Sequence, residues 1–321
     1  MATLPNWNLD SIYPSNDESA FRADISKITT LHSDITKFLS AKDSNQSISA
    51  YLTTVIRSYE ELIDIYETLD AYANALLSVK TTDKKAAQRV HDVSLAGLRV
   101  QQAHVAVVES LYSHKGEIEQ LLLDDSWKSY RYVILELLDE KHHLMSSDQE
   151  DLAADLMRSG SDAFTRLHEA ITSNVDIEWR GEKKTVIELR ALAFDPDREV
   201  RRSAFEKELE LLKRNEISLA FALNGVKGSA VTLYGRRNYS SAIENALKQS
   251  RISKEVLDAM IGSIEDHLSM FQRYFLAKAH YLHLEKLSFY DLVKEKIVDL
   301  PVKESFFVQT GRGEHIVDAH M

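Results

Sequence analysis

The 321-residue sequence contains no cysteine. Disulfide bonds, thiolate metal sites and cysteine nucleophiles are therefore excluded, and a complete absence of cysteine is typical of proteins from the reducing cytosol. No uninterrupted apolar run approaches the ~20 residues that a membrane span requires, and the first ten residues, MATLPNWNLD, lack a basic and an apolar leader region. We expect a soluble, cytoplasmic protein without a membrane partner.

Positive charge is also scarce. The chain has 39 Lys and Arg against 50 Asp and Glu, which gives a net charge of −11 at pH 7. Affinity for a phosphate backbone depends on clustered cations, so the composition argues against a nucleic-acid partner.

Glycine and proline, with 10 and 4 residues, are far below their usual shares. Because few residues interrupt helices, the sequence predicts long ones.

Apolar residues repeat with the period of an α-helix in two consecutive stretches. They recur alternately four and three residues apart at Ile48, Leu52, Val55, Tyr59, Leu62, Tyr66, Leu69, Ala73 and Leu76, which predicts one long helix. After the turn KTTD the spacing resumes at Ala86, Val90, Val93, Gly97, Val100, His104, Val107 and Leu111. So short a connection predicts an antiparallel helical hairpin. Gly97 is expected to allow close approach of a neighbouring element.

Capping patterns place the remaining elements. Ser15 with Glu18, and Ser146 with Gln149, read as capping boxes at helix starts, and Gly160 is expected to end the second of these helices. Alternation at Val175, Ile177 and Trp179, followed by RGE and KKTV, predicts a β-hairpin near residues 175–186.

Two further long helices are predicted toward the C-terminus. Asp195 is expected as the N-cap and Pro196 as the first residue of a helix that continues past Glu216 to a turn at residues 235–239. A last long helix is expected from Ser253, burying Val256, Leu257, Met260, Ile261, Ile264, Leu268, Phe271 and Phe275. The predicted fold class is mainly α, with long antiparallel helical hairpins, a helical bundle and one small β-hairpin.

The C-terminal sequence GRGEHIVDAHM suggests a zinc site but fails its spacing requirements. A helical His-Glu-x-x-His site needs histidines four residues apart and a glutamate after the first of them. Here His315 and His320 are five apart, about 140° around a helix, and Glu314 precedes its histidine. Gly311 and Gly313 disfavour a helix as well. We therefore interpret residues 293–321 as a flexible polar tail.

Three other groups of histidines have alternative interpretations. His280 and His283, with Glu285 nearby, could hold zinc on one helix face, although this spacing is also ordinary on a solvated surface, which we favour. His142 and His143 precede a capped helix and are expected to close a helix end rather than bind metal.

His104 lies in an apolar seam, where a hydrogen-bonded core histidine is the favoured interpretation. Glu216 is expected to have a basic partner or an exposed position, because a lone buried carboxylate is costly. The sequence has no Gly-rich phosphate loop and no G-x-S-x-G elbow. No residue is assigned a catalytic, cofactor-binding or metal-binding role.

Five segments together point to one family. They are WNLDSIYPS from residue 7, HLMSSDQEDLAADLMRSGSDAFTRLHEAI from His143, IEWRGEKKTV from Ile177, FDPDREVRRSAFEKE from Phe194 and RYFLAKAHYLHLEKLSFYDL ending at Leu292. In the same order, they resemble segments of the N-terminal half of the oligoendopeptidase F family of zinc metallopeptidases. The resemblance therefore covers residues 5–292.

The resemblance implies a helical ellipsoid with a deep channel, in which a zinc site hydrolyses short peptides and narrow access excludes folded proteins. It implies that this half forms one wall, whereas the zinc ligands and general base belong to the C-terminal half. No catalytic or metal residue can be transferred to this chain, whose 321 residues contain no His-Glu-x-x-His motif. Residues 293–321 do not match the family's continuation, so we expect a truncated or frameshifted product.

Three functional hypotheses follow. The favoured one is a truncated oligoendopeptidase half that is inactive alone, has no zinc of its own and exposes an apolar surface. The alternative is a helical protein that binds short peptides or a partner, such as a separately encoded catalytic half. The third is a working peptidase that uses His280, His283 and the tail histidines.

Overall fold

The structure is a computed structural model that describes residues 8–14, 17–41 and 46–292. The chain divides into two compact units, Met1–Arg166 with Leu223–Asn245, and Leu167–Ala222 with Ala246–Met321. Helices dominate both units, and the only sheet among the described residues is a two-stranded hairpin. The predicted mainly α fold class is confirmed. None of the described helices is long and apolar enough to cross a membrane.

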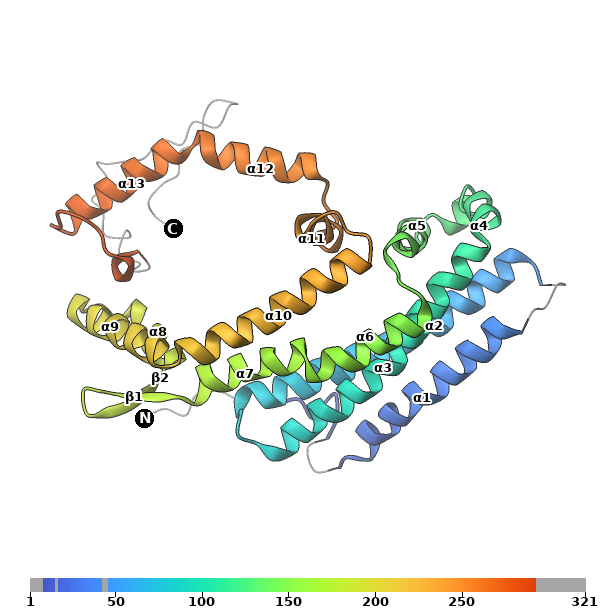
Figure 1. Cartoon of the computed structure of the whole chain (residues 1–321), viewed down its shortest axis with the longest axis horizontal. Helices are drawn as coiled ribbons and strands as arrows, with labels where there is room; N and C mark the ends of the chain where they lie inside the picture. Colours follow the sequence, from blue (N-terminus) through green and yellow to red (C-terminus); the bar gives the residue numbers. More distant parts are fainter. Residues whose placement is uncertain (1–7, 15–16, 42–45, 293–321) are drawn as a thin grey trace. The chain divides into compact units, whose positions relative to one another are not determined.

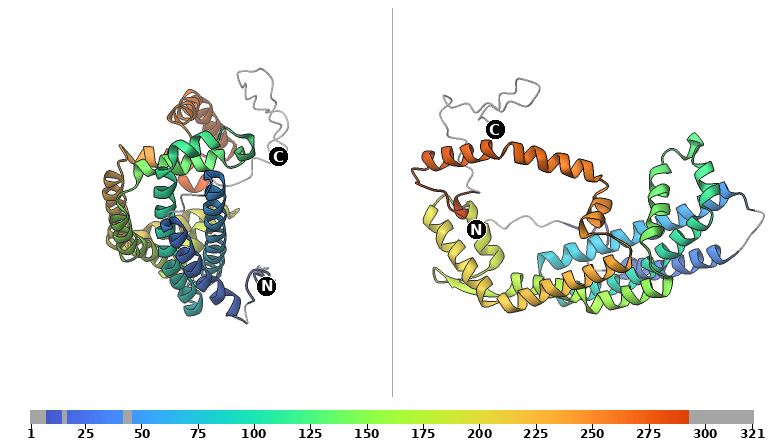
Figure 2. Two further views of the ribbon diagram at one scale, coloured as in Figure 1. Left: turned by 90° about the vertical axis from the view of Figure 1, so that its right-hand side faces the viewer. Right: turned by 45° about the horizontal axis from the view of Figure 1, so that its top comes forward.

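The first unit begins with three long helices that lie side by side in both views of Figure 2. These are α1 (Ser19–Ser40), α2 (Ile48–Val79) and α3 (Lys84–Ser113), followed by α4 (Lys115–Leu121), α5 (Arg131–Glu140) and α6 (Ser147–Ser159) (Figure 1). Ser47 and Asp83 cap α2 and α3 by accepting backbone N–H groups of the first turn. The buried apolar seam of α2 and α3 forms most of the largest core cluster.

Contacts between α2 and α3 confirm the predicted antiparallel hairpin. Tyr51 Oη lies 2.6 Å from Ser110 Oγ, and eight residues later Tyr59 Oη lies 2.6 Å from the Nδ1 atom of His104. Later residues of α2 thus contact earlier residues of α3, which means that the two helices run antiparallel. The close approach predicted at Gly97 is confirmed, because a Cβ there would lie 2.8 Å from Tyr66 Oη.

Helix starts match the capping predictions in part. Ser146 and Gln149 form the expected capping box of α6, and Gly160 ends that helix. The proposed partner of Glu18, Ser15, lies outside the described residues. Helix α1 begins at Ser19, where Asp17 accepts the backbone N–H and the hydroxyl of that serine.

Helices α7 (Ser161–Asn174) and α10 (Glu216–Arg236) each contribute residues to both units. Within the first unit they pack tightly, because a Cβ on Gly225 of α10 would overlap the ring of Phe164 on α7. No side chain larger than hydrogen fits at position 225 without movement of that ring.

The second unit contains the predicted β-hairpin. Strands β1 (Asp176–Trp179) and β2 (Glu182–Thr185) pair antiparallel, with Trp179 opposite Glu182. The two-residue turn has positive φ at Arg180 (50°) and Gly181 (82°), as a tight hairpin turn requires. Thr185 and Glu188 then form a capping box that starts α8 (Val186–Ala191). Ile177, Val186 and Leu189 join Ala204 and Leu211 in a small core.

The predicted N-cap at Asp195 is wrong. Helix α9 spans Arg198–Arg214, and its N-cap is Asp197, whose carboxylate accepts the backbone N–H of Glu199 at 2.9 Å. Asp195 instead accepts the N–H of Asp197 at 2.8 Å. This local hydrogen bond forms a turn before the helix and moves its start by two residues.

The prediction of one helix running past Glu216 is also wrong. Asn215, with φ −106° and ψ 9°, separates α9 from α10. Its side-chain amide donates to the carbonyl oxygen of Leu211 at 2.9 Å. Such side-chain bonds compete with the helical backbone pattern, which the apolar spacing alone does not register.

The predicted last helix is divided in the same way. The chain forms α11 (Ala242–Ser250), α12 (Lys254–Asp266) and α13 (Leu268–Tyr281), with His267 between the last two, and then the 3₁₀ turn η4 (Phe289–Asp291). The expected burial of this region is wrong, because none of the residues of α12 is buried. The apolar side chains expected in a core are exposed at Val256, Met260, Ile261, Ile264, Leu268, Phe271 and Phe275.

Candidate functional site

The favoured surface interpretation of His280, His283 and Glu285 agrees with their positions. All three are exposed, His280 lies in the last turn of α13, and His283 has a φ of 54° in the turn that follows. Across the described ranges, no group of three His, Asp or Glu side chains is arranged to hold a metal ion. Glu314, His315 and His320 lie outside these ranges, so the flexible tail stays a prediction.

His104 is hydrogen-bonded on both ring nitrogens, as expected for a core histidine. Its Nε2 atom lies 2.8 Å from a carboxylate oxygen of Glu140 on α5. A carboxylate only accepts, so Nε2 donates to it, and Nδ1 of the neutral ring accepts from Tyr59. Burial, with a smaller effect of the Glu140 charge, raises the pKa of Tyr59. This tyrosine is therefore a hydrogen-bond donor and a poor nucleophile.

His143 has the structural role expected near a helix end. It is buried, stacks on Tyr239 with ring centroids 4.0 Å apart, and donates from Nδ1 to the carbonyl oxygen of Arg237 at 3.0 Å. Its neighbour His142 makes an edge contact with Tyr112. Glu216 is exposed and forms an ion pair with Lys213, as expected.

Arg237 also holds a fully buried carboxylate that sequence reasoning missed. The Glu150 side chain on α6 is 0% exposed and accepts from Arg237 Nε at 3.1 Å and Nη2 at 2.6 Å. The same carboxylate accepts the backbone N–H of Met145 at 3.0 Å. Residues 87 positions apart are thereby joined within the first unit, and no local spacing pattern predicts the pair.

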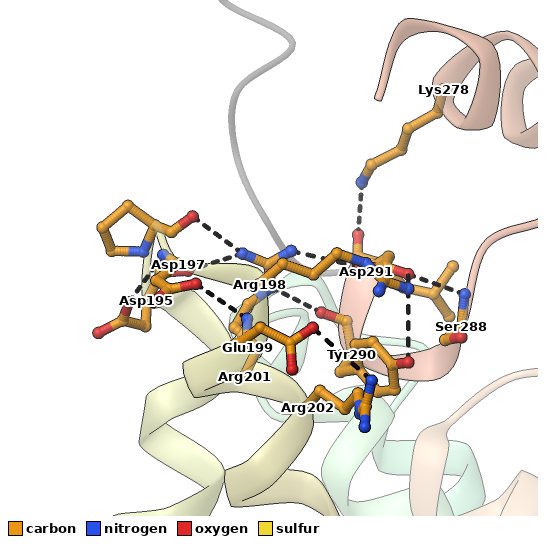
Figure 3. Close-up of polar contacts among 12 residues, drawn as sticks. Asp195, Asp197, Arg198, Glu199, Arg201, Arg202, Lys278, Ser288, Tyr290 and Asp291 are labelled. Carbon is orange, nitrogen blue, oxygen red and sulfur yellow. Dashed lines mark hydrogen bonds and ion pairs between the residues drawn. The ribbon is translucent and has the colours of Figure 1, made fainter. Parts of the chain in front are cut away.

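A second buried ion cluster joins α9 to η4 in the second unit (Figure 3). Asp291 has no exposed side-chain area and accepts from Arg198 Nε and Nη2, each at 3.0 Å. It also accepts from Arg201 Nη2 at 3.3 Å and from the backbone N–H of Ser288 at 3.0 Å. Two arginines three residues apart on one helix therefore share one carboxylate.

The remaining hydrogen bonds of this cluster bind backbone oxygens. Arg201, 2% exposed, donates to the carbonyl oxygens of Tyr290 at 2.8 Å and Asp195 at 2.9 Å. Lys278 of α13 donates to the carbonyl oxygen of Leu292 at 2.9 Å (Figure 3). Residues 290–292 are thus held in place by cations from two helices.

The charge states of the cluster follow from these contacts. Burial raises the pKa of the Asp291 carboxyl, but hydrogen bonds from Arg198 and the Ser288 backbone outweigh it, so the pKa lies below its ordinary value. The bond to Asp291 raises the pKa of Arg198, and burial lowers that of Lys278. An ionised carboxylate held by two arginines is a structural anchor rather than a general base.

The described surface also has a shallow hollow along α1. Its wall includes Thr29, His32, Ser33, Thr36, Lys37 and Arg99. It contains a single imidazole and no carboxylate, which is not the donor set of a hydrolytic metal site.

The strongest surface feature is exposed apolar area. Helix α10 exposes Ile217, Phe221, Leu223 and Val231, and α12 and α13 expose an apolar row along their length. Contiguous apolar surface of this kind is typical of a contact with another protein. Helices α10, α12 and α13 therefore carry exposed apolar side chains.

Comparison with known proteins identifies relatives of one kind. The family described as Oligopeptidase F matches residues 111–176. Oligopeptidase PepF of Bacillus subtilis (strain 168) is 26% identical over 312 residues, covering 94% of this chain and 45% of the relative. The oligoendopeptidase F homolog of Borreliella burgdorferi is 20% identical over 308 residues, covering 94% of this chain and 50% of the relative.

A solved structure has the same fold. The crystal structure of oligoendopeptidase-F from Enterococcus faecium superposes with a TM-score of 0.68 at 23% identity, covering 87% of this chain and 56% of the other. The chain spans about half the length of the curated relatives it matches.

Proposed function

Since the chain belongs to the oligoendopeptidase F family, we propose that it supplies the N-terminal, non-catalytic half of such a peptidase and does not hydrolyse peptides by itself. One observation carries the proposal: the match takes in 94% of this chain but 45% of Oligopeptidase PepF. A match over so much of the chain supports an intact half of a peptidase rather than a short shared motif.

The chemistry of the residues present supports inactivity. Metal-assisted peptide hydrolysis needs a cation that polarises the amide carbonyl and activates water, together with a base. The sequence contains no His-Glu-x-x-His motif, and the two fully buried carboxylates, Glu150 and Asp291, are both held by arginine. The zinc of the family therefore has no fitting ligand set among the described residues, and no hydrolytic step is assigned to them.

The partners and location follow from the same proposal. The natural partner is a catalytic half, or short peptides that such a pair would bind, while the net charge of −11 argues against nucleic acid. Residues 1–292 form the functional region. The absence of cysteine supports a cytoplasmic location.

Hydrolysis of a short internally quenched peptide by the purified chain tests the proposal, with and without added zinc and with the bound metal measured in parallel. We expect no cleavage and no stoichiometric zinc in protein that circular dichroism shows to be helical. Chelator-sensitive cleavage would contradict the proposal. In that case a His280→Ala, His283→Ala variant, compared with His91→Ala, would show whether the surface histidines hold the metal.

The exposed side chains of α10 favour a second function, the binding of peptides or a partner protein. Phe221 is 67% exposed and Ile217 is 75% exposed on this helix. Fluorescence anisotropy of a labelled apolar peptide should then show saturable binding that Phe221→Ser weakens and Leu156→Ser leaves unchanged. Equal loss in both variants, or no saturation, would reject this function.

A further inference from the structure

The hollow along α1 has cations and hydroxyl groups in its wall but no acidic side chain. We define the α1 hollow by six of the side chains that line it, Thr29, His32, Ser33, Thr36, Lys37 and Arg99. Its volume of about 670 Å³ lies within the range of about 300–1,000 Å³ that is usual for small-molecule sites. Helix α1 supplies five of these residues and α3 supplies Arg99, and the two helices lie side by side within the first unit (Figure 2).

The side chains from α1 share one face of that helix. They follow the spacing i, i+3, i+4, i+7 and i+8, which places them in one sector of a helix with 3.6 residues per turn. A different face of α1 packs into the core through Phe21, Ile28 and Ile35, all of which are buried. Because this packing fixes the rotation of α1, the polar face is held in the wall of the hollow.

The two permanent charges of the hollow have no counter-charge. Neither the Lys37 ammonium group nor the Arg99 guanidinium group forms an ion pair or a hydrogen bond with any residue that the structure describes. Lys27, earlier on the same helix, does pair with a carboxylate, that of Glu61. The hollow thus presents two uncompensated cations to one space, in a chain whose net charge is −11.

His32 adds an imidazole without a hydrogen-bond partner. Its side chain is half-buried, and neither ring nitrogen is bonded to a residue within the described ranges, although buried polar groups in proteins usually have a partner. Burial lowers the pKa of His32, the charge of Arg99 lowers it further, and Asp151 of α6 has a smaller, opposite effect. An anion between His32 and Arg99 would reverse the effect of the arginine and favour the protonated ring.

Two hydroxyl groups complete the set of donors. The Thr36 hydroxyl already donates to the carbonyl oxygen of His32 at 2.8 Å, whereas those of Thr29 and Ser33 have no bond to a described residue. A guanidinium group matches the oxygens of phosphate or sulfate as a planar fork, and an ammonium group acts as a point charge. The donors in the hollow therefore suit a group with several oxygens and two negative charges.

We propose that the α1 hollow binds a small dianionic oxyanion, a phosphate or sulfate group, between Arg99, Lys37 and His32. This site lies outside the proposed peptidase function and does not depend on it. Because the hollow is open and its cations remain in contact with water, the affinity should be modest, with a Kd on the order of 1 mM.

A titration of the full chain with sodium sulfate, followed by NMR of labelled histidine rings, tests the proposal. The His32 signals, assigned by their loss in His32→Gln, should shift and saturate. Arg99→Gln and Lys37→Gln should each raise the Kd at least about fivefold, because each removes a charge-assisted hydrogen bond. Arg57→Gln is the matched control, since it removes the same charge from an exposed arginine of α2 outside the hollow and should leave the Kd unchanged.

The pH dependence of sulfate binding tests the role of His32. Sulfate stays a dianion between about pH 6 and pH 8, and Arg99, Lys37 and Asp151 stay ionised there, so the imidazole is the group that titrates. Since the bound anion favours the protonated ring, the affinity should rise as the pH falls through this range. His32→Gln should bind with a Kd that does not change with pH.

A second comparison identifies the source of the oxyanion. Inorganic phosphate and glycerol phosphate are both dianions at about pH 8 but differ in size. Tighter binding of the ester would indicate an organic phosphate as the ligand, and equal binding would indicate the free anion. Both results support the site, provided that Arg99→Gln weakens them.

Three results would overturn the proposal. They are His32 signals that do not saturate by about 50 mM sulfate, far above the expected Kd, an equal loss of affinity in Arg57→Gln and Arg99→Gln, and an unchanged pH dependence in His32→Gln. Lys37, Arg57 and Arg99 are exposed, so circular dichroism should show the same helix content in these variants as in the wild type.

Discussion

Asp291→Asn is expected to destabilise the second unit by about 3 kcal/mol, because it removes the only acidic side chain bonded to Arg198 and Arg201 in the described cluster. Asparagine keeps the volume, but its amide group would face arginine donors, and Arg201 at 2% exposure would remain buried without a counter-charge. Removing one partner of a buried pair typically costs ~3–5 kcal/mol. We take the lower end because Arg198 is one-third exposed and can be solvated.

Urea unfolding followed by Trp179 fluorescence measures this loss. Replacement of Trp7 and Trp127 by phenylalanine leaves Trp179 as the single tryptophan, since the chain has three. Glu206→Gln on the same helix is the control, because its pair with Arg202 is exposed and should contribute less than about 1 kcal/mol. A loss in Asp291→Asn no larger than in the control would refute the reasoning that this cluster anchors the unit.

The pH dependence of the same variant checks the charge. The pKa of Asp291 is lowered in the folded state, so its contribution is present above the unfolded pKa of about 3.9 and is lost as pH falls through the folded pKa. The stability difference between wild type and variant should therefore be constant near neutral pH and shrink in acid. A difference that grows in acid would contradict an ionised Asp291.

Three further changes have defined outcomes. Gly225→Ala should lower the free energy of unfolding by about 2 kcal/mol, because the added Cβ would overlap Phe164. Gly228→Ala on the same helix should raise it by up to ~1 kcal/mol, because an added Cβ there meets no atom within 4 Å. The thermal unfolding midpoints of the two variants should therefore move in opposite directions. Tyr59→Phe should cost about 1 kcal/mol in urea unfolding, because it leaves Nδ1 of His104 without its donor, and an unchanged midpoint would show that water replaces the bond. Gly181→Ala should cost about 1 kcal/mol at its φ of 82°, and loss of the pairing between β1 and β2 in hydrogen exchange would report it; unchanged exchange would argue against this turn geometry.

The sequence predicts the elements whose determinants are local. The seam from Ile48 to Leu76, the short KTTD turn and the tight contact at Gly97 were sufficient for the α2–α3 hairpin. The Ser146 capping box and the Arg180–Gly181 turn are also local, since each depends on residues fewer than five apart.

Apolar spacing does not predict the hydrogen bonds by which polar side chains end a helix. Asn215 and His267 each interrupt a helix that apolar spacing alone extends, and each bonds to a carbonyl oxygen four residues earlier. Apolar spacing also does not say whether a face is covered, so Ile264 and Phe271 were expected in a core although they are exposed.

The two buried ion clusters could not be predicted because their partners are distant in sequence. Glu150 and Arg237 are 87 residues apart, and Arg198 and Asp291 are 93 apart. A weak local signal did exist for the second cluster. Arg198 and Arg201 lie three apart on one helix face, and Ser288 with Asp291 has capping-box spacing, which together suggest a cationic face near a fixed carboxylate.

The lack of buried residues in α12 has a kinetic consequence. Amide groups that depend on a helix without packed neighbours open in local fluctuations, whereas those in a dense core exchange only when the whole unit unfolds. The backbone of α12 should therefore exchange its hydrogens far sooner than α2 or α3, whose seams are buried. Among the described helices, a protease added in limiting amount should cut α12 before α2 or α3, so the long helices of the first unit should persist longer.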